Sequence, residues 1–156
     1  KHLGGSLDSF ACYLLERSIK TLALRVERQS ANAMALALFL RGHRSVRRVN
    51  YPGLPDFPGH EIARAQMRGY GGMLSFFLDE GRLHPDTFVR RLGLIVPAVS
   101  LGGVDTTICS PAATSHSTLS PQERERLGIT PSLFRLSAGI EHVDDLIADL
   151  EQALEG

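Results

Sequence analysis

The stretch LFRLSAGIEHVDDLIADLEQAL (Leu133 to Leu154) contains the two hydrophobic periodicities that decide the fold class. Its first part alternates apolar Phe134 and Leu136 with polar residues, which indicates a strand with one buried face and with Arg135 on the opposite face. Its second part has an apolar stripe at helical spacing, formed by Val143, Leu146, Ile147, Leu150 and Leu154. A strand followed directly by an amphipathic helix is typical of an α/β domain.

The residues before this stretch continue the alternation of helical and strand-like patterns. No Gly or Pro occurs between Ser6 and Arg41, which predicts two helices that meet near Ile19 and Lys20, with Ser18 or Thr21 as the candidate cap of the second. We predict further helices over residues 60–68, 85–92 and 121–127 and strands over residues 45–51 and 72–78. Pro85 is expected in the first turn of its helix, and Ser120 with Glu123 is expected to form a capping box for a helix that stops at Gly128. The expected fold is therefore α/β with an open sheet.

Composition and charge restrict the classes of function. The chain has 156 residues, enough for one domain, and its 17 Lys and Arg residues balance 17 Asp and Glu residues. A net charge of zero does not favour binding to nucleic acid. No apolar run approaches the roughly 20 residues of a membrane helix. Cys12 and Cys109 lie far apart without a metal-binding spacing, which favours a reducing, cytoplasmic setting.

The candidate motifs for nucleophilic, phosphate or metal chemistry are weak. Six histidines are scattered without ligand spacing, so we predict no metal site. Cys109 with His116 as its base is one alternative, but a cysteine in an apolar strand is more often a small buried residue. Ser100 does not lie in a G-x-S-x-G motif, and the glycines of residues 68–73 lack the Lys-Ser/Thr ending of a phosphate loop.

Arg135 is the residue with the clearest chemical requirement. A guanidinium between apolar Phe134 and Leu136 needs an anion if it is partly buried, because an unpaired buried charge is costly. A structural Asp or Glu and the carboxylate of a ligand both remain open as partners, and the structural acid is the more frequent case.

Four blocks of the sequence together resemble one enzyme family. The blocks are KTLALRVERQSANAMALALFL (20–40), YPGLPDFPGHEIARAQMRGYGGMLSF (51–76), VSLGGVDTTICSPAATSHS (99–117) and LFRLSAGIEHVDDLIADLEQAL (133–154). In order and approximate spacing they are similar to the Cys/Met-metabolism (transsulfuration) family of enzymes that use pyridoxal 5'-phosphate (PLP). This family includes cystathionine γ-synthase, cystathionine γ-lyase, methionine γ-lyase and O-acylhomoserine sulfhydrylases.

The resemblance implies a fold and a domain organisation. We expect the C-terminal small domain of a fold-type-I PLP enzyme, with a small, mostly antiparallel sheet flanked by helices and a long linking helix. Residues 1–20 would be an interdomain linking segment and residues 21–156 the substrate-closing domain. The large PLP-binding domain is expected to be absent from this chain. That domain would be the partner of this chain, and the complete enzyme would be a homotetramer built as a dimer of dimers.

The resemblance also assigns the candidate site. Ser100 and Arg135 match positions that hold the α-carboxylate of the amino-acid substrate, and Ser115 keeps a hydroxyl where the family usually has Thr. Val99 stands where several cystathionine-handling members carry Glu, which is more similar to the methionine γ-lyase and sulfhydrylase branches. The expected reaction is γ-elimination or γ-replacement on a sulfur amino acid or an O-activated homoserine.

No lysine matches the residue that forms the Schiff base with PLP. Lys20 corresponds to a non-catalytic position of the family, and Lys1 has no matching context. The sequence therefore predicts no catalytic residue in this chain, and the chain alone is predicted to be inactive. The residues that bind the cofactor remain unknown. A non-catalytic interaction module descended from such an enzyme is the alternative function.

Overall fold

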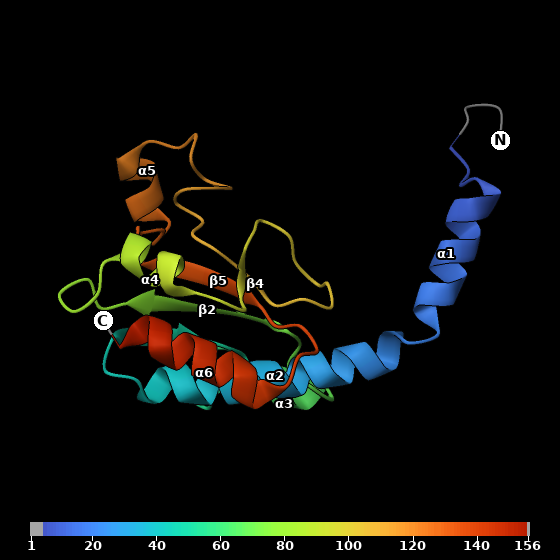
Figure 1. The fold of residues 1–156 in the computed structure, drawn as a ribbon, viewed down its shortest axis with the longest axis horizontal. Coiled ribbons are helices and arrows are strands. Elements are labelled where there is room, and N and C mark those ends of the chain that lie inside the picture. Colours follow the sequence, from blue (N-terminus) through green and yellow to red (C-terminus); the bar gives the residue numbers. More distant parts are fainter. Residues whose placement is uncertain (1–4, 156) are drawn as a thin grey trace.

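In the computed structural model, which describes residues 5–155, two N-terminal helices lead into a mixed sheet covered by helices (Figure 1). The helices are α1 (Ser9–Ile19), α2 (Leu22–Gly42), α3 (His60–Gln66), α4 (Pro85–Arg91), α5 (Pro121–Arg126) and α6 (Val143–Leu154). The strands are β1 (Val46–Asn50), β2 (Met73–Leu78), β3 (Val96–Pro97), β4 (Thr107–Cys109) and β5 (Leu133–Ser137). The predicted α/β class is confirmed, whereas the two-residue strand β3 was not predicted.

The five strands form one sheet in the order β1-β2-β5-β4-β3. β2 pairs antiparallel with β1 and with β5, and β5 pairs antiparallel with β4, whereas β3 and β4 run parallel. The sheet is therefore mixed, with antiparallel pairing at its centre. β5 lies between β2 and β4, so Arg135 pairs with Ser75 on one side and Cys109 on the other.

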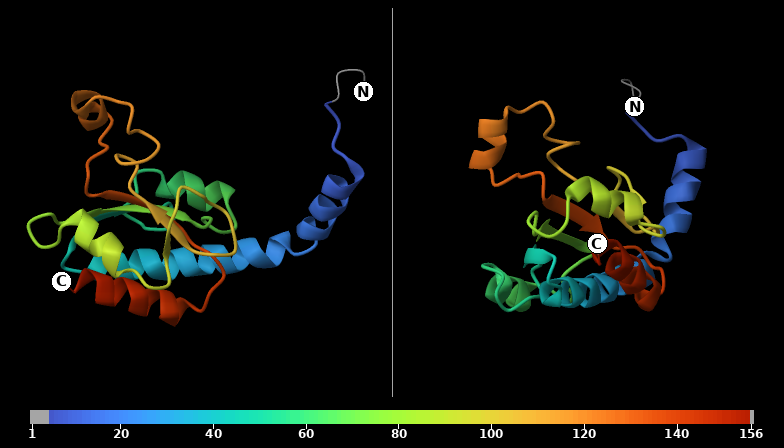
Figure 2. Two further views of the ribbon diagram at one scale, coloured as in Figure 1. Left: turned by 45° about the horizontal axis from the view of Figure 1, so that its top comes forward. Right: turned by 60° about the vertical axis from the view of Figure 1, so that its left-hand side comes forward.

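One face of the sheet carries the hydrophobic core. Phe76 of β2 and Phe134 of β5 are stacked with ring centroids 5.8 Å apart, and Phe88 of α4 meets Phe134 edge-on at 5.2 Å. Helices α2 and α6 add buried apolar residues such as Leu36 and Leu150. Figures 1 and 2 show α2 and α6 together beneath the sheet, whereas α5 and the loop before it rise on the opposite side.

Several local predictions are confirmed at the helix ends. The Ser120 hydroxyl accepts a hydrogen bond from the backbone N–H of Glu123, and the Glu123 carboxylate accepts one from the backbone N–H of Ser120, which completes the capping box of α5. Gly128, with φ of +70°, follows the end of this helix. Pro85 occupies the first turn of α4, as expected.

The junction between the first two helices differs in detail from the prediction. α1 ends at Ile19 and α2 begins at Leu22, so two helices meet where they were expected. However, Thr21 precedes α2 without a side-chain cap, because its hydroxyl donates to the carbonyl of Ser18 and accepts from Arg25. Thr21 thus stands at the predicted N-cap position, but the predicted side-chain capping is wrong for Thr21 and for Ser18, whose hydroxyl donates to the Leu14 carbonyl.

Helix α1 makes little contact with the rest of the protein. None of its residues is buried, and large apolar side chains such as Phe10 and Tyr13 are more than half exposed. Figure 1 shows α1 projecting away from the sheet. None of the helices within residues 5–155 combines the length and the apolar character that crossing a membrane requires.

Candidate functional site

Arg135 lies on the face of β5 that the core helices leave uncovered. Phe134 and Leu136 are buried on the core face, and Arg135 is half-buried on the other, as the alternation predicted. Ser75 and Cys109 lie beside it on the neighbouring strands, and neither is an acidic residue that would pair with the guanidinium. The position and the small neighbours leave room for an anion from outside the sheet.

The contacts of Arg135 hold the guanidinium in place without neutralising its charge. Nη2 donates to the carbonyl oxygens of Val99 at 2.7 Å and Ser100 at 3.2 Å. Nε is buried without a hydrogen-bond partner. Among the ion pairs of residues 5–155, none involves Arg135. The sequence left two possible partners for Arg135, an Asp or Glu of the protein and the carboxylate of a ligand. No Asp or Glu of the described chain pairs with it, which favours the ligand carboxylate.

Ser100 lies beside Arg135 although 35 residues separate them. It follows β3 and is exposed, and its carbonyl oxygen accepts hydrogen bonds from the Thr107 hydroxyl at 2.8 Å and from Arg135. Its hydroxyl takes part in no hydrogen bond with the described residues. The fold therefore brings the first two predicted site residues together and leaves the Ser100 hydroxyl free for a ligand.

The loop of residues 99–105, here called the Ser100 loop, is held by residues that the sequence analysis did not single out. Gln29 of α2 donates to the carbonyl of Gly103 at 2.7 Å, and Ser137 of β5 accepts from the backbone N–H of Gly102 at 2.8 Å. Gln29 is one of two buried polar residues of α2, together with Asn32. Its helical spacing from the buried Ala33 and Leu36 was the signal that the sequence offered.

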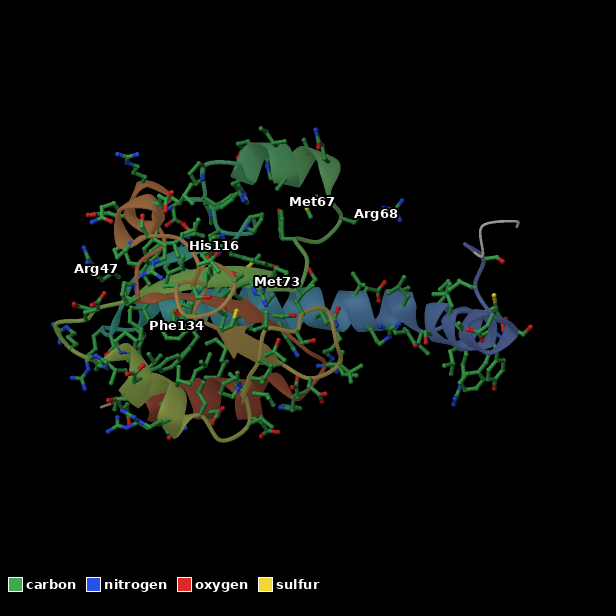
Figure 3. The ribbon with its side chains drawn as sticks, turned by 90° about the horizontal axis from the view of Figure 1, so that it is seen from above. Arg47, Met67, Arg68, Met73, His116 and Phe134 are labelled. Atoms are coloured by element: carbon green, nitrogen blue, oxygen red, sulfur yellow. The ribbon has the colours of Figure 1, made fainter. Side chains whose placement is uncertain are left out.

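Ser115 lies in a different segment, the loop between β4 and α5. Its hydroxyl is 2.8 Å from Nδ1 of His116, and no described hydrogen bond joins it to Ser100 or Arg135. Figure 3, viewed from above the sheet, marks His116 in this loop and Phe134 in the strand below. Cys109 is only 8% exposed, which confirms its interpretation as a buried strand residue.

A groove of about 790 Å³ lies between α4, β3, β4 and the loop after β4, and neither Arg135 nor Ser100 lines it. Val99, whose carbonyl contacts Arg135, forms part of its wall, together with Ser110, Ala112, Ala113 and Thr114 of the loop after β4. Pro85 and Val89 of α4 and Ile108 of β4 are apolar lining residues, and charged side chains also line the groove: Glu80, Asp86, Arg90 and Arg124. Val99 is therefore the residue that joins the contacts of Arg135 to one wall of the groove.

The segment that leads into β3 is fixed by Asp149 of α6. This buried carboxylate accepts hydrogen bonds from the backbone N–H groups of Gly93, Leu94 and Ile95 at 2.7, 3.0 and 2.8 Å. Burial alone would raise the pKa of Asp149, but these hydrogen bonds and one from Gln152 outweigh it and hold the pKa below its usual value. The charged carboxylate thus anchors the chain just ahead of the Ser100 loop.

The described residues offer neither a metal site nor a lysine near Arg135. No group of three or more His, Cys, Asp or Glu side chains gathers within residues 5–155. Lys20 is exposed at the end of α1, where its ammonium group lies 2.8 Å from the Glu16 carboxylate. Lys1 lies outside the described residues.

Comparison with known proteins gives consistent matches over the whole chain. Residues 1–155 match the family described as Cys/Met metabolism PLP-dependent enzyme. Cystathionine gamma-lyase of Dictyostelium discoideum is 44% identical over 153 residues, which are 98% of this chain and 40% of that protein. L-methionine gamma-lyase of Fusobacterium nucleatum subsp. polymorphum is 46% identical over 97% of this chain and 38% of that protein.

The fold also matches solved structures. A crystal structure of cystathionine gamma-lyase from Micromonospora echinospora superimposes with a TM-score of 0.93 at 41% sequence identity. The match covers 99% of this chain and 40% of that one. The chain therefore spans about two fifths of the length of the proteins that it matches.

Proposed function

The chain belongs to the Cys/Met metabolism PLP-dependent enzymes, and we propose that it is the substrate-closing part of one that acts on a sulfur amino acid or an O-activated homoserine. The proposed reaction is γ-elimination or γ-replacement. The observation that carries the proposal is Arg135, a half-buried guanidinium fixed by backbone carbonyls but lacking an acidic partner among the described residues.

Arg135 is suited to bind the α-carboxylate of an amino acid. A guanidinium offers planar donors that match a carboxylate, and such charge-assisted hydrogen bonds are stronger than neutral ones. Its Nη2 is already held by Val99 and Ser100, so the group is oriented before the substrate arrives. Preorganisation of this kind reduces the entropy lost on binding and fixes the orientation of the substrate's Cα.

The two serines complete the proposed site in different ways. Ser100 is exposed and contacts Arg135 through its carbonyl oxygen, and we propose that its hydroxyl donates to the same carboxylate. Ser115 lies in the loop that borders the groove, where its hydroxyl is paired with His116. We propose that Ser115 contacts the substrate from this loop when the site closes.

The residues described here fit the substrate carboxylate but do not fit covalent attachment of PLP. PLP, when bound, supplies an electron sink for reactions at the amino-acid Cα. It is held as a Schiff base with a lysine, and Lys20 is exposed on α1 and paired with Glu16. We propose that the lysine and the other groups that hold PLP belong to the part of the relatives' length that this chain does not span, and that the chain alone is inactive.

Val99 supports a proposal about the substrate. Its apolar side chain is exposed and Val99 lines the groove, while its carbonyl oxygen contacts Arg135. The distal ammonium group of cystathionine would find no carboxylate at this position. We therefore propose a preference for a substrate with an uncharged side-chain end, such as a thioether.

Helix α1 supports the proposed division into a linking segment, residues 1–20, and a substrate-closing domain, residues 21–156. Its apolar side chains are exposed around the helix, as expected of a segment enclosed by protein that is not present here. We propose that the large domain of the same enzyme covers α1, and that the complete enzyme is a cytoplasmic homotetramer.

The proposal is tested by removing the guanidinium in the full-length, PLP-loaded protein. The probes are L-norleucine, which resembles methionine but has no leaving group, and pentylamine, which is the same molecule without its carboxylate. We expect Arg135→Ala to weaken L-norleucine binding on the order of a hundredfold, measured by calorimetry, and to leave pentylamine binding unchanged. The visible absorbance of the cofactor should also remain.

Arg47→Ala is the matched control, because Arg47 is exposed on β1 (Figure 3). It removes the same charge and should bind both probes as the unmodified protein does. Unchanged L-norleucine affinity in Arg135→Ala would overturn the proposal and favour a non-catalytic interaction module.

A further inference from the structure

We propose that Gln29 of α2 is a positioning residue that sets the place of the Ser100 loop and thereby the affinity of the site for amino-acid carboxylates. The inference rests on the proposed function, because the Ser100 loop and Arg135 form the proposed carboxylate site. Gln29 lies on the helix that follows α1 and contacts the loop at Gly103, whereas Arg135 and Thr107 contact it at Ser100.

The amide group of Gln29 reaches the loop at its two glycines. Nε2 donates to the carbonyl of Gly103 at 2.7 Å and approaches that of Gly102 at 3.5 Å. Gln29 is only 7% exposed, so these contacts are largely shielded from water. Loss of a shielded donor leaves a carbonyl oxygen without a partner, which is more costly than loss of the same bond at the surface.

The loop has a conformation that requires such anchors. Gly102 has φ of +72°, a value that residues with a side chain rarely adopt. Its N–H donates to the Ser137 hydroxyl of β5, and the following carbonyl groups face Gln29 of α2. The turn is thus held from a strand on one side and from a helix on the other.

The anchored turn determines where the carboxylate-binding groups lie. Ser100 is two residues before Gly102, and its carbonyl oxygen contacts both Arg135 and Thr107. A turn released from Gln29 would shift this carbonyl and loosen the orientation of the guanidinium. Among the described hydrogen bonds of α2, those of Gln29 are the ones that reach the Ser100 loop, so the helix acts on the site through this side chain.

Gln29→Met tests the inference, because methionine has a similar length and fills the site without donating a hydrogen bond. In the full-length, PLP-loaded protein we expect the Kd of L-norleucine to rise about fivefold. The KM for the amino-acid substrate should rise by the same factor, with kcat little changed. Pentylamine affinity should not change, because it has no carboxylate. Hydrogen exchange of the peptide covering residues 98–106 should become faster, whereas the peptide covering α6 should exchange as before.

Gln66→Met, at the exposed end of α3, is the matched control and should behave as the unmodified protein. If Gln29→Met does not fold, Gln29→Asn keeps the amide but shortens its reach and should give the same pattern. Lower thermal stability with unchanged L-norleucine affinity would overturn the inference, because Gln29 would then be structural only. If Arg135→Ala weakens L-norleucine binding and Gln29→Met does not, only the inference about Gln29 fails. If neither variant weakens L-norleucine binding, the proposed function fails as well.

Discussion

The two faces of β5 carry residues with opposite roles at adjacent positions. Phe134 and Leu136 are almost fully buried against α4, α2 and α6, whereas Arg135 lies between them on the uncovered face and keeps a charge without an acidic partner in the described chain. The core face consists of apolar side chains packed against one another, whereas the other face holds a guanidinium that forms no ion pair with the described residues. This unpaired, half-buried charge supports the proposal that the Arg135 face binds the substrate, because a face that only stabilised the fold would be expected to pair it.

The largest expected effect separates these two faces by their contribution to stability. We expect Phe134→Ala to lower the free energy of unfolding by about 3–5 kcal/mol, because it leaves a cavity among Phe76, Phe88 and Leu136. Arg135→Ala in the same urea titration should change it by less than about 1 kcal/mol. A similar loss in both variants would contradict the division of roles.

A smaller effect concerns the buried anchor on the core side. We expect Asp149→Asn to lower the free energy of unfolding by about 2 kcal/mol at neutral pH, because an amide cannot accept all the backbone hydrogen bonds of Gly93, Leu94 and Ile95. The measurement is urea unfolding of both proteins as a function of pH.

The pH dependence of this difference has a definite sign. The pKa of Asp149 is lowered in the folded state, so the stability that the charged carboxylate contributes is present above the usual aspartate pKa of about 4. It is lost as the pH falls through the lower folded-state pKa. The difference between the two proteins should therefore shrink in acid, and a difference that grew in acid would contradict this role.

The smallest effect is expected at α5, on the uncovered side of the sheet. No residue of α5 is buried, so its stability depends on its own capping box rather than on packing. We expect Ser120→Ala to speed hydrogen exchange of the α5 amides about fivefold and to leave α6 unaffected. Exchange at the unmodified rate would show that the loop contacts, such as that of Arg124 with the Ala112 carbonyl, hold the helix instead.

Local patterns predicted much of the fold but little of the network around the site. The alternation at Phe134 and Leu136, the stripe of α6 and the Ser120 capping box each depend on neighbours within a few residues. β3 consists of Val96–Pro97 and forms only because β4 lies beside it, so no periodicity could reveal it. The roles of Gln29 and Asp149 depend on backbone groups 54 or more residues away.

The sequence by itself determined the α/β class, the local elements and, through its resemblance to a family, the pairing of Ser100 with Arg135 as a candidate site. Only the tertiary structure decided that Arg135 has no acidic partner in the described chain and that Gln29 reaches the Ser100 loop. The physical reason is that periodicity reports which side of an element is buried, whereas the partner of a buried polar group is set by which segments the fold brings together.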